Sequence, residues 1–513
     1  MGKHLTTSLT VLALLPLVLT TACTGPPPSS ASSPAPGQNA ATASAAPIAP
    51  RSTAWIKPVW TKKLEPIGQP LLHDGVALAI TGEGQLMELV ALDVKNGKEL
   101  WRKDYHPGDV SSGIVNGPAV AEDSKGHVRA VFLQRGHIPD EDYGTYNWTV
   151  PVAVDLKSGK EVYRGKSPEL ATSRPDECDD GTDLCYRRWR LSEDITELVH
   201  VDLATGQVKH GKEASPLGEQ AQPIGAGGLV VRGGDQQRLA RADQGKVLWQ
   251  KNLKSVFGAG ASTGWGWSFD YLEEKNLFIG AVGIRPRPDL SDEDFDELDS
   301  YTIDATDQVL VGIQATTGKV LWKAGGAHLW CRSQMGTSGT RFHDGEAYPV
   351  RCEFLSGSVQ VPGKNTYRKG KARLVGYDPL TGKTAWKSKT VKLAQTDELL
   401  RPTAGRGDYV LTGKASGNLI VDAAIGKNRR AAAGETFFCT ADVYYNLPIE
   451  PDEESPGHGA GGDLYTSCKA NGKKAKGYTV GAVKDVDNAE QGVTVVAEEG
   501  KLLGFKLPPG KKS

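Results

Sequence analysis

A short motif that recurs along most of the chain is the feature that most constrains the fold. It reads Ala-Leu-Asp-Val-Lys-Asn-Gly-Lys-Glu-Leu-Trp at residues 91–101 and Gly-Tyr-Asp-Pro-Leu-Thr-Gly-Lys-Thr-Ala-Trp at residues 376–386. Each copy predicts a β-hairpin, in which a strand ends at Asp, a Gly adopts positive φ in the turn, and the next strand carries an aromatic residue. We expect the Asp to accept hydrogen bonds from turn amides and the Trp to pack against the next copy.

Degenerate copies extend this pattern from the first fifth of the chain to its end. Their turn glycines are Gly97, Gly159, Gly206, Gly245, Gly318, Gly382, Gly426 and Gly500. Successive glycines are 39 to 74 residues apart. A unit of four strands needs about 40 residues, so the longer intervals indicate inserted loops.

The spacing of Asp, Thr-Gly-Lys and Trp resembles the PQQ-like (quinoprotein-type) β-propeller repeat, over about residues 55–506. The resemblance implies an all-β chain folded as a single β-propeller. Counting turns predicts eight four-stranded blades; seven blades, with the last copy split, is the alternative. The repeat tryptophans, which we expect to pack between blades, are Trp60, Trp101, Trp249, Trp322 and Trp386.

The N-terminus predicts export. One lysine, Lys3, precedes an apolar run at residues 9–19, which is typical of a secretory signal and shorter than the roughly 20 residues of a membrane-spanning helix. Thr20-Thr21-Ala22-Cys23 resembles the bacterial lipobox, although Thr20 stands where such motifs usually have Leu. We therefore expect a lipidated (palmitate-bearing) Cys23, and a lipoprotein held on the extracytoplasmic side of the cell membrane.

The composition of the remaining chain distinguishes a tether from the part that is expected to fold. Residues 24–50 are almost wholly Gly, Pro, Ala, Ser and Thr and carry no charge, which predicts a tether. The expected organisation is a signal peptide at 1–22, Cys23 and the tether at 23–54, the propeller at 55–506 and a tail at 507–513. The formal net charge of −1 gives no electrostatic footprint for nucleic acid.

Six cysteines remain when Cys23 is set aside, and an even number in an exported chain suggests disulfides. Chain order makes three pairs the simplest expectation, although other pairings are possible: Cys178 with Cys185, Cys331 with Cys352, and Cys439 with Cys468. A metal site is the alternative. No pair has CxxC spacing or a nearby His at finger distance, so no metal is expected.

An enzyme must be considered, because the family contains quinone-dependent alcohol and glucose dehydrogenases. The resemblance implies that some of these stack the quinone between a disulfide of adjacent cysteines and a Trp, beside calcium. This chain has no Cys-Cys pair. We therefore expect neither PQQ nor calcium and no catalytic residue, while a dehydrogenase with an atypical site stays open as the alternative.

Two further sequence patterns partly match known functional motifs. Gly260-Ala-Ser-Thr-Gly264 matches the Gly-x-Ser-x-Gly of a nucleophile elbow, but no helix is expected after it. Asp292, Asp294 and Asp296 alternate as in a calcium loop, but Glu297 stands where that loop needs Gly. Both segments are expected to be loops.

Aromatic residues outside the repeat frame are the remaining candidates for a binding surface, because Trp and Tyr in loops often anchor partners. They could equally pack onto their own blades. These candidates are Trp148, Trp189, Trp265, Trp267 and Trp330. The function expected from the sequence is a non-catalytic binding or scaffold module for envelope proteins, with a sensor of cell-wall glycan as a further alternative.

Overall fold

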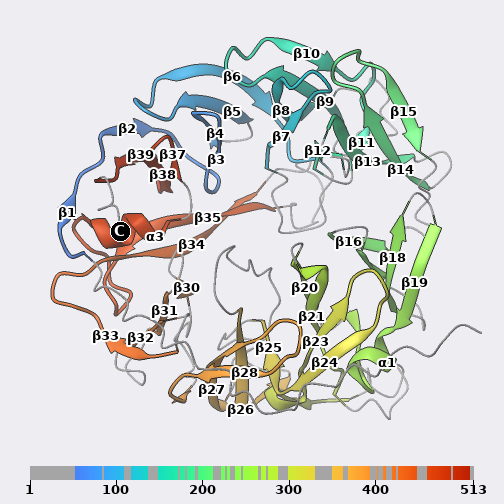
Figure 1. Ribbon diagram of the computed structural model, residues 1–513, viewed down its shortest axis with the longest axis vertical. Helices are drawn as coiled ribbons and strands as arrows, with labels where there is room; N and C mark the ends of the chain where they lie inside the picture. Colours follow the sequence, from blue (N-terminus) through green and yellow to red (C-terminus); the bar gives the residue numbers. More distant parts are fainter. Residues whose placement is uncertain are drawn as a thin grey trace, which may run out of the picture. The chain divides into compact units, whose positions relative to one another are not determined.

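The computed structural model consists almost wholly of antiparallel strands (Figure 1). Met1–Ile48 and Ala49–Ser513 form two units, and the residues described belong to the second. The structure describes residues 52–83, 86–108, 117–136, 148–171, 174–178, 182–190, 195–211, 221–225, 228–231, 237–243, 246–263, 267–272, 275–286, 298–329, 349–361, 368–392, 401–402, 408–411, 419–422, 426–446, 459–486 and 489–508.

Eight sheets of four or more strands succeed one another along the described residues. The first, β3-β4-β5-β6, consists of Leu71–His73, Val76–Glu83, Leu86–Asp93 and Glu99–Tyr105. The second, β7 to β10, consists of Ala119–Glu122, Val128–Arg135, Thr149–Asp155 and Glu161–Arg164. The third, β11 to β15, consists of Leu170–Ala171, Asp176–Glu177, Leu184–Arg190, Ile195–Val201 and Val208–Gly211.

The middle sheets follow the same plan with longer insertions. The fourth, β16 to β19, consists of Ala221–Gly225, Gly228–Val231, Arg238–Asp243 and Lys246–Asn252. The fifth contains β20, β21, β23 and β24, at Trp267–Leu272, Leu277–Val282, Val309–Gln314 and Val320–Gly325. The sixth contains β22 and β25 to β29, at Tyr301–Asp304, Ala327–His328, Val350–Val361, Arg368–Tyr377, Thr384–Lys387 and Val391–Lys392. Two short helical segments accompany them, α1 at Leu253–Phe257 and a 3-10 turn at Ala305–Asp307.

The last sheets contain both ends of the described chain. The seventh, β30 to β33, consists of Arg401–Pro402, Asp408–Leu411, Leu419–Asp422 and Asn428–Arg430. In the eighth, β2 (Trp60–Lys63) pairs with β39 (Lys501–Lys506), followed by β38 (Val493–Glu498) and β37 (Ala489–Glu490). An N-terminal strand therefore completes the C-terminal sheet, with Trp60 opposite Gly504.

The recurrent turns have the predicted geometry. Asp93 Oδ1 accepts from Lys95 N at 2.8 Å, and Asp378 Oδ1 accepts from Thr381 N at 2.8 Å. Gly97 and Gly382 have φ of +68° and +67°, in the region that glycine occupies at no steric cost. Each Gly N–H also donates to the carbonyl of its turn Asp, at 2.8 Å in both turns.

Repeat tryptophans join one sheet to the turn of the next, as predicted. Trp322 Nε1 donates to Pro379 O at 2.7 Å, and a Cβ on Gly382 would lie 2.6 Å from the indole ring of Trp322. The indoles of Trp60, Trp101 and Trp249 donate in the same way to Val94, Leu156 and Ala315. The Trp386 ring packs on Gly426 at the corresponding point.

Apolar clusters fill the spaces between consecutive sheets. Leu89 and Ala91 of the first sheet pack with Phe132 and Val152 of the second, and all four are fully buried. Another cluster joins the eighth sheet to the first through residues that include Val495 and Val90. Consecutive antiparallel sheets that pack through apolar clusters, with β2 completing the last sheet, confirm the predicted β-propeller. The blade number of eight stays a prediction.

An additional hairpin departs from the repeat. β34 (Phe437–Asn446) and β35 (Gly459–Cys468) form a two-stranded sheet between the seventh and eighth sheets in the sequence. Phe437 packs with Ile420 of the seventh sheet, whereas Phe438 packs with Val496 of the eighth. Adjacent strand residues point to opposite faces, so the base of the hairpin contacts both neighbours. Helix α3 (Val480–Asp485) and β36 (Tyr478–Thr479) follow it.

The tryptophan contact predicts the effect of enlarging a turn glycine. In Gly382→Ala the new methyl would overlap the Trp322 ring and strain a positive φ, so we expect the free energy of unfolding to fall by about 3 kcal/mol. Gly492 is the matched control, because its φ is +78° and a Cβ there would meet nothing within 4 Å. Gly492→Ala is expected to cost about 1 kcal/mol. Urea unfolding of the two variants measures the difference, and equal losses would contradict the packing role.

Candidate functional site

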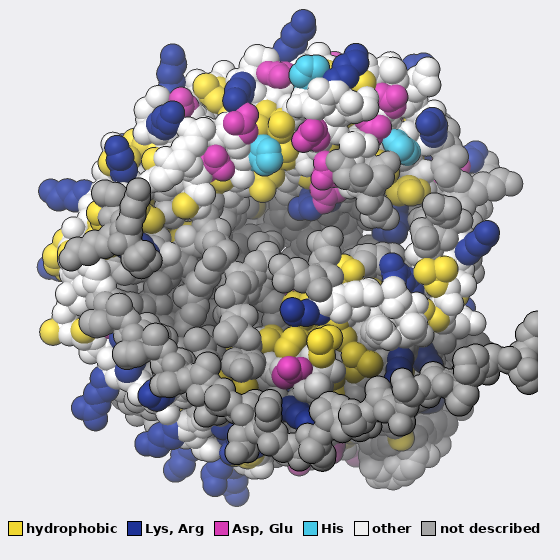
Figure 2. All heavy atoms as spheres, in the orientation of Figure 1, with side chains coloured by type: hydrophobic (Ala, Val, Ile, Leu, Met, Phe, Trp, Pro, Cys, Tyr) yellow, Lys and Arg dark blue, Asp and Glu magenta, His cyan; other side chains and the backbone are white. Residues whose placement is uncertain are grey.

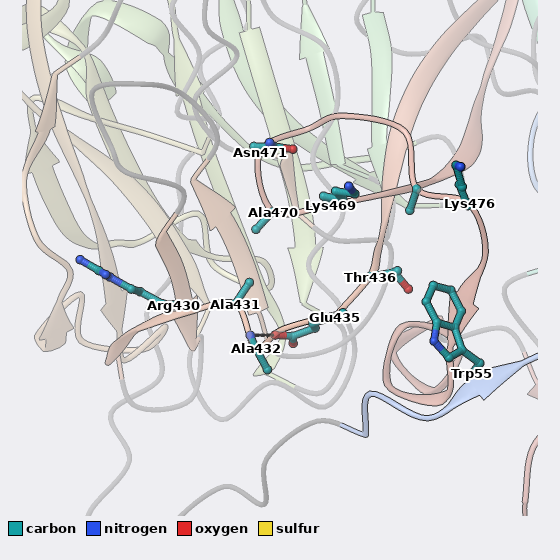
Figure 3. A pocket seen from close by; sticks show the side chains of 12 residues that line it. Trp55, Arg430, Ala431, Ala432, Glu435, Thr436, Lys469, Ala470, Asn471 and Lys476 are labelled. Carbon is teal, nitrogen blue, oxygen red and sulfur yellow. Dashed lines mark hydrogen bonds between the residues drawn. The ribbon is translucent and has the colours of Figure 1, made fainter.

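A cavity of about 770 Å³ opens beside the additional hairpin. Its walls come from three separate segments: Trp55, residues within 430–436 and residues within 469–476. Figure 3 shows Trp55 and Lys476 on one side of the cavity and Arg430 at the far side, with Lys469 and Asn471 between them. We call this the seam pocket, because it lies where the hairpin joins the seventh and eighth sheets.

Trp55 is placed by strand pairing. It belongs to β1 (Trp55–Ile56), which pairs with β36 so that Trp55 lies opposite Thr479. Gly477 leaves room for the indole, since a Cβ there would lie 2.8 Å from the ring. The side chain nevertheless remains 61% exposed. An aromatic ring is therefore held at the surface by backbone pairing.

A buried ion pair fixes the floor of the pocket. Glu435 is 5% exposed, and it accepts hydrogen bonds from both terminal nitrogens of Arg429 at 2.7 and 2.8 Å. It also accepts from Ala432 N at 2.8 Å, drawn as a dashed line in Figure 3. A bidentate pair of this kind is geometrically specific. Its carboxylate is thus occupied and does not neutralise the cations at the pocket entrance.

The third wall is a turn that directly follows a disulfide. Cys468, at the end of β35, is joined to Cys439 of β34. Gly472 N donates to Lys469 O, and Ala475 N donates to Ser467 O, both at 2.8 Å. These bonds fold residues 469–476 back on the hairpin.

Five exposed cations lie in the pocket lining or in the turn that contributes to it. Arg430, Lys469 and Lys476 line the pocket, and Lys473 and Lys474 belong to the same turn, residues 469–476. None forms an ion pair within the part of the chain that the structure describes. In Figure 2 the acidic side chains and histidines of the visible face lie mostly in its upper part, whereas Lys and Arg project all around its margin.

The profile of the family described as "Outer membrane protein assembly factor BamB" matches residues 301–436. Residues 301–436 are therefore similar to the repeats of the PQQ-like β-propeller family. A search of curated proteins found no match.

Several solved structures resemble the chain weakly. BamB from Moraxella catarrhalis is 11% identical, with a TM-score of 0.35 over 75% of this chain and 97% of that one. The uncharacterized protein lmo1340 from Listeria monocytogenes EGD-e is 12% identical, with a TM-score of 0.34 over 73% and 95%. A europium-containing methanol dehydrogenase is 12% identical, with a TM-score of 0.27 over 89% and 81%. No activity is inferred from these similarities.

PQQ-like propellers include quinone enzymes, but the described residues do not fit a stacked quinone. The Trp322 indole lies between Gly382 and Gly312, with the Arg351 guanidinium 6.0 Å from its centroid. The two disulfides whose cysteines both lie within the described residues join positions 7 and 29 apart, not adjacent ones. The aromatic and disulfide groups that could hold the cofactor are therefore occupied in blade contacts and loop closure.

The expected cysteine pairs are only partly within the described residues. The structure joins Cys178 to Cys185 and Cys439 to Cys468, and Cys352 is also disulfide-bonded. Cys23 and Cys331 lie outside the described residues. One described group, Cys178, Cys185 and His200, has atoms close enough to hold a metal ion, but its two sulfurs are bonded to each other.

The tryptophans proposed as a binding surface belong to different sheets. Trp148 precedes β9, Trp189 lies in β13 and Trp267 lies in β20, and all three are half-buried. Trp267 packs 6.4 Å from Phe269, which favours a packing role for this residue. Trp265 and Trp330 are outside the described residues. The binding role of the five stays a prediction.

Residues of the seam pocket were missed from sequence. The available signal was local composition, since residues 469–476 contain Lys469, Lys473, Lys474 and Lys476 in a nearly neutral chain.

The two weaker sequence patterns, a Gly-x-Ser-x-Gly match and an acidic loop, lie partly or wholly outside the described residues. Ser262 donates its backbone N–H to Gly283 O at 3.0 Å, and residues 264–266, which follow it, are outside the described residues. Asp292, Asp294 and Asp296 are outside the described residues. No helix within the described ranges is long and apolar enough to cross a membrane.

One buried titratable group lies away from the pocket. His106, at the end of β6, is 5% exposed, and its Nδ1 accepts from Gly108 N at 3.1 Å. Burial, with a smaller contribution from the charge of Arg135, lowers the pKa of His106 from 6.5 to about 4. The hydrogen bond also requires an unprotonated Nδ1, so the folded state favours neutral imidazole.

This histidine makes stability depend on pH. Unfolded His106 binds its proton near pH 6.5 and the folded form only near pH 4, so the free energy of unfolding should fall as the pH drops through that interval. The total loss is about 3 kcal/mol. His106→Asn keeps an acceptor but cannot titrate, and its stability curve should be flatter between pH 6.5 and 4. Exposed His73→Asn is the control, and a wild-type slope in His106→Asn would contradict the assignment.

Proposed function

We propose that this chain is a non-catalytic binding or scaffold propeller, held on the extracytoplasmic side of the cell membrane by a lipid on Cys23. The observation that carries the proposal is the seam pocket. Its exposed groups are cations, an indole and an amide, which bind ligands or partners but form no nucleophile–base pair. The repeat tryptophans are engaged between blades, so they serve the rigidity of the scaffold.

The family match supports envelope proteins as partners. The matched profile is described as an outer membrane protein assembly factor, and residues 301–436 cover the whole of the sixth and seventh sheets. Pocket residues 430–436 lie at the end of this match, whereas Trp55 and residues 469–476 lie outside it. A surface that differs from the shared repeat is a reasonable place for a specific partner, because function resides in sites built on a fold.

Lipidation is tested by metabolic labelling with an alkyne-bearing palmitate analogue. The wild-type chain should be labelled and sediment with membranes, whereas Cys23→Ser should be exported but unlabelled, because it lacks the acceptor thiol. Cys439→Ser is the matched control, since it also replaces one cysteine by serine but leaves the Cys23 acceptor in place and should keep its label. Equal labelling of wild-type protein and Cys23→Ser would refute the anchor.

Absence of quinone catalysis is tested by reconstitution. The purified protein is incubated with pyrroloquinoline quinone and calcium, and dye reduction is followed with alcohols and sugars as substrates. We expect rates equal to those of protein-free cofactor, because the described residues offer no vacant stacking site. Turnover above that background with any substrate would replace the scaffold function by a dehydrogenase function.

A further inference from the structure

We propose that the seam pocket and its rim form a second membrane contact, which binds anionic phospholipid headgroups of the bilayer that holds the lipid anchor. This inference rests on the proposed lipidation and location. It adds that the propeller is oriented on the membrane by its own surface.

Charge is the first argument. Arg430 and the four lysines of residues 469–476 are exposed and form no ion pair with a described residue. Glu435, the one carboxylate in the pocket lining, is committed to Arg429. A basic side chain near an anionic leaflet contributes about 1 kcal/mol of binding free energy. The combined binding free energy of five such groups would favour one orientation of the tethered domain over free rotation.

The exposed indole is the second argument. Trp55 is 61% exposed beside these cations. The backbone pairing of β1 with β36 does not itself require an aromatic residue at this position. Trp is enriched at membrane–water interfaces, where its ring meets the headgroups. Cations surrounding a surface aromatic residue suit a layer of anionic headgroups better than an enclosed small ligand, because the charges lie on the exposed rim.

The position of the anchor is the third argument. Trp55 lines the pocket and is also the first residue after the predicted tether. A flexible chain of the 31 residues from 24 to 54 has an average end-to-end distance of roughly 30 Å. The anchor would thus keep this surface near the bilayer, at an effective concentration on the order of millimolar. Weak electrostatic contacts then suffice to orient the domain.

The test uses the intact lipoprotein in lipid nanodiscs, with mass spectrometry confirming the acyl chains. Acetylation rates of individual lysines are compared between discs of phosphatidylglycerol with phosphatidylcholine and discs of phosphatidylcholine alone. Lys473 and Lys474 should react about fivefold more slowly on the anionic discs. Lys251 of β19 and Lys254 of α1, which are both exposed, should react equally on both kinds of disc. Raising the salt to 1 M should remove the protection, because the Debye length falls to about 3 Å.

Charge reversal supplies the matched variants. In Lys469→Glu with Lys476→Glu, protection of Lys473 and Lys474 should be lost, whereas Lys251→Glu with Lys254→Glu changes net charge equally and should preserve it. Thermal unfolding verifies that both variants are folded. Equal rates on the two kinds of disc, or equal effects of the two variants, would overturn the proposal.

Two further outcomes are informative. Protection by millimolar inorganic phosphate on neutral discs would overturn the proposal in favour of a small-anion site. Absence of the acyl mass would instead refute the anchor. The two failures are therefore distinguishable.

Discussion

Packing of a tryptophan onto the glycine of the next turn is the contact on which the rest of the structure depends. A sheet in a propeller is covered on both faces, so each sheet must recognise its neighbour specifically. The indole supplies a large apolar area and one donor, and the turn supplies a carbonyl and a glycine without Cβ. Replacing such a buried Trp by Ala typically costs about 3–5 kcal/mol. Four equivalent indole-to-carbonyl bonds join sheets from one end of the chain to the other.

Closure by the N-terminal strand concentrates unusual features at one place. β2 completes the eighth sheet, while β1 pairs with β36 after the additional hairpin. Phe437 and Phe438 contact the sheets on either side, and Cys439–Cys468 holds the base of the hairpin. The seam pocket arises because the hairpin, the last strand of the seventh sheet and the N-terminal strand meet without the regular repeat contact.

Structures formed by residues close in the sequence were predictable, whereas pairings between residues far apart in the sequence were not. Asp378, Gly382 and Trp386 lie within nine residues, so the turn and its aromatic strand can be derived from the sequence by short-range rules. Trp60 stands before the first copy of the repeat in the sequence, but the structure places it in the last sheet. Pairing of β2 with β39 joins residues more than 400 positions apart, and no local preference specifies it. The seam pocket combines three distant segments for the same reason, and only its lysines left a trace in composition.

The position of this pocket also has a mechanical consequence. Any force transmitted by the expected tether reaches the folded chain at β1, which is only two residues long and pairs with β36. Val480 N donates to Ala54 O at 2.8 Å, so helix α3 also holds the entering chain. The next strand, β2, is paired along four residues with the last strand of the chain. Tension would therefore act first on the seam and only afterwards on the closed ring. If the cationic surface rests on the membrane at this point, its contacts carry part of the force that would otherwise act on the pairing of β1 with β36. The residues that orient the propeller would then also protect this pairing from tension.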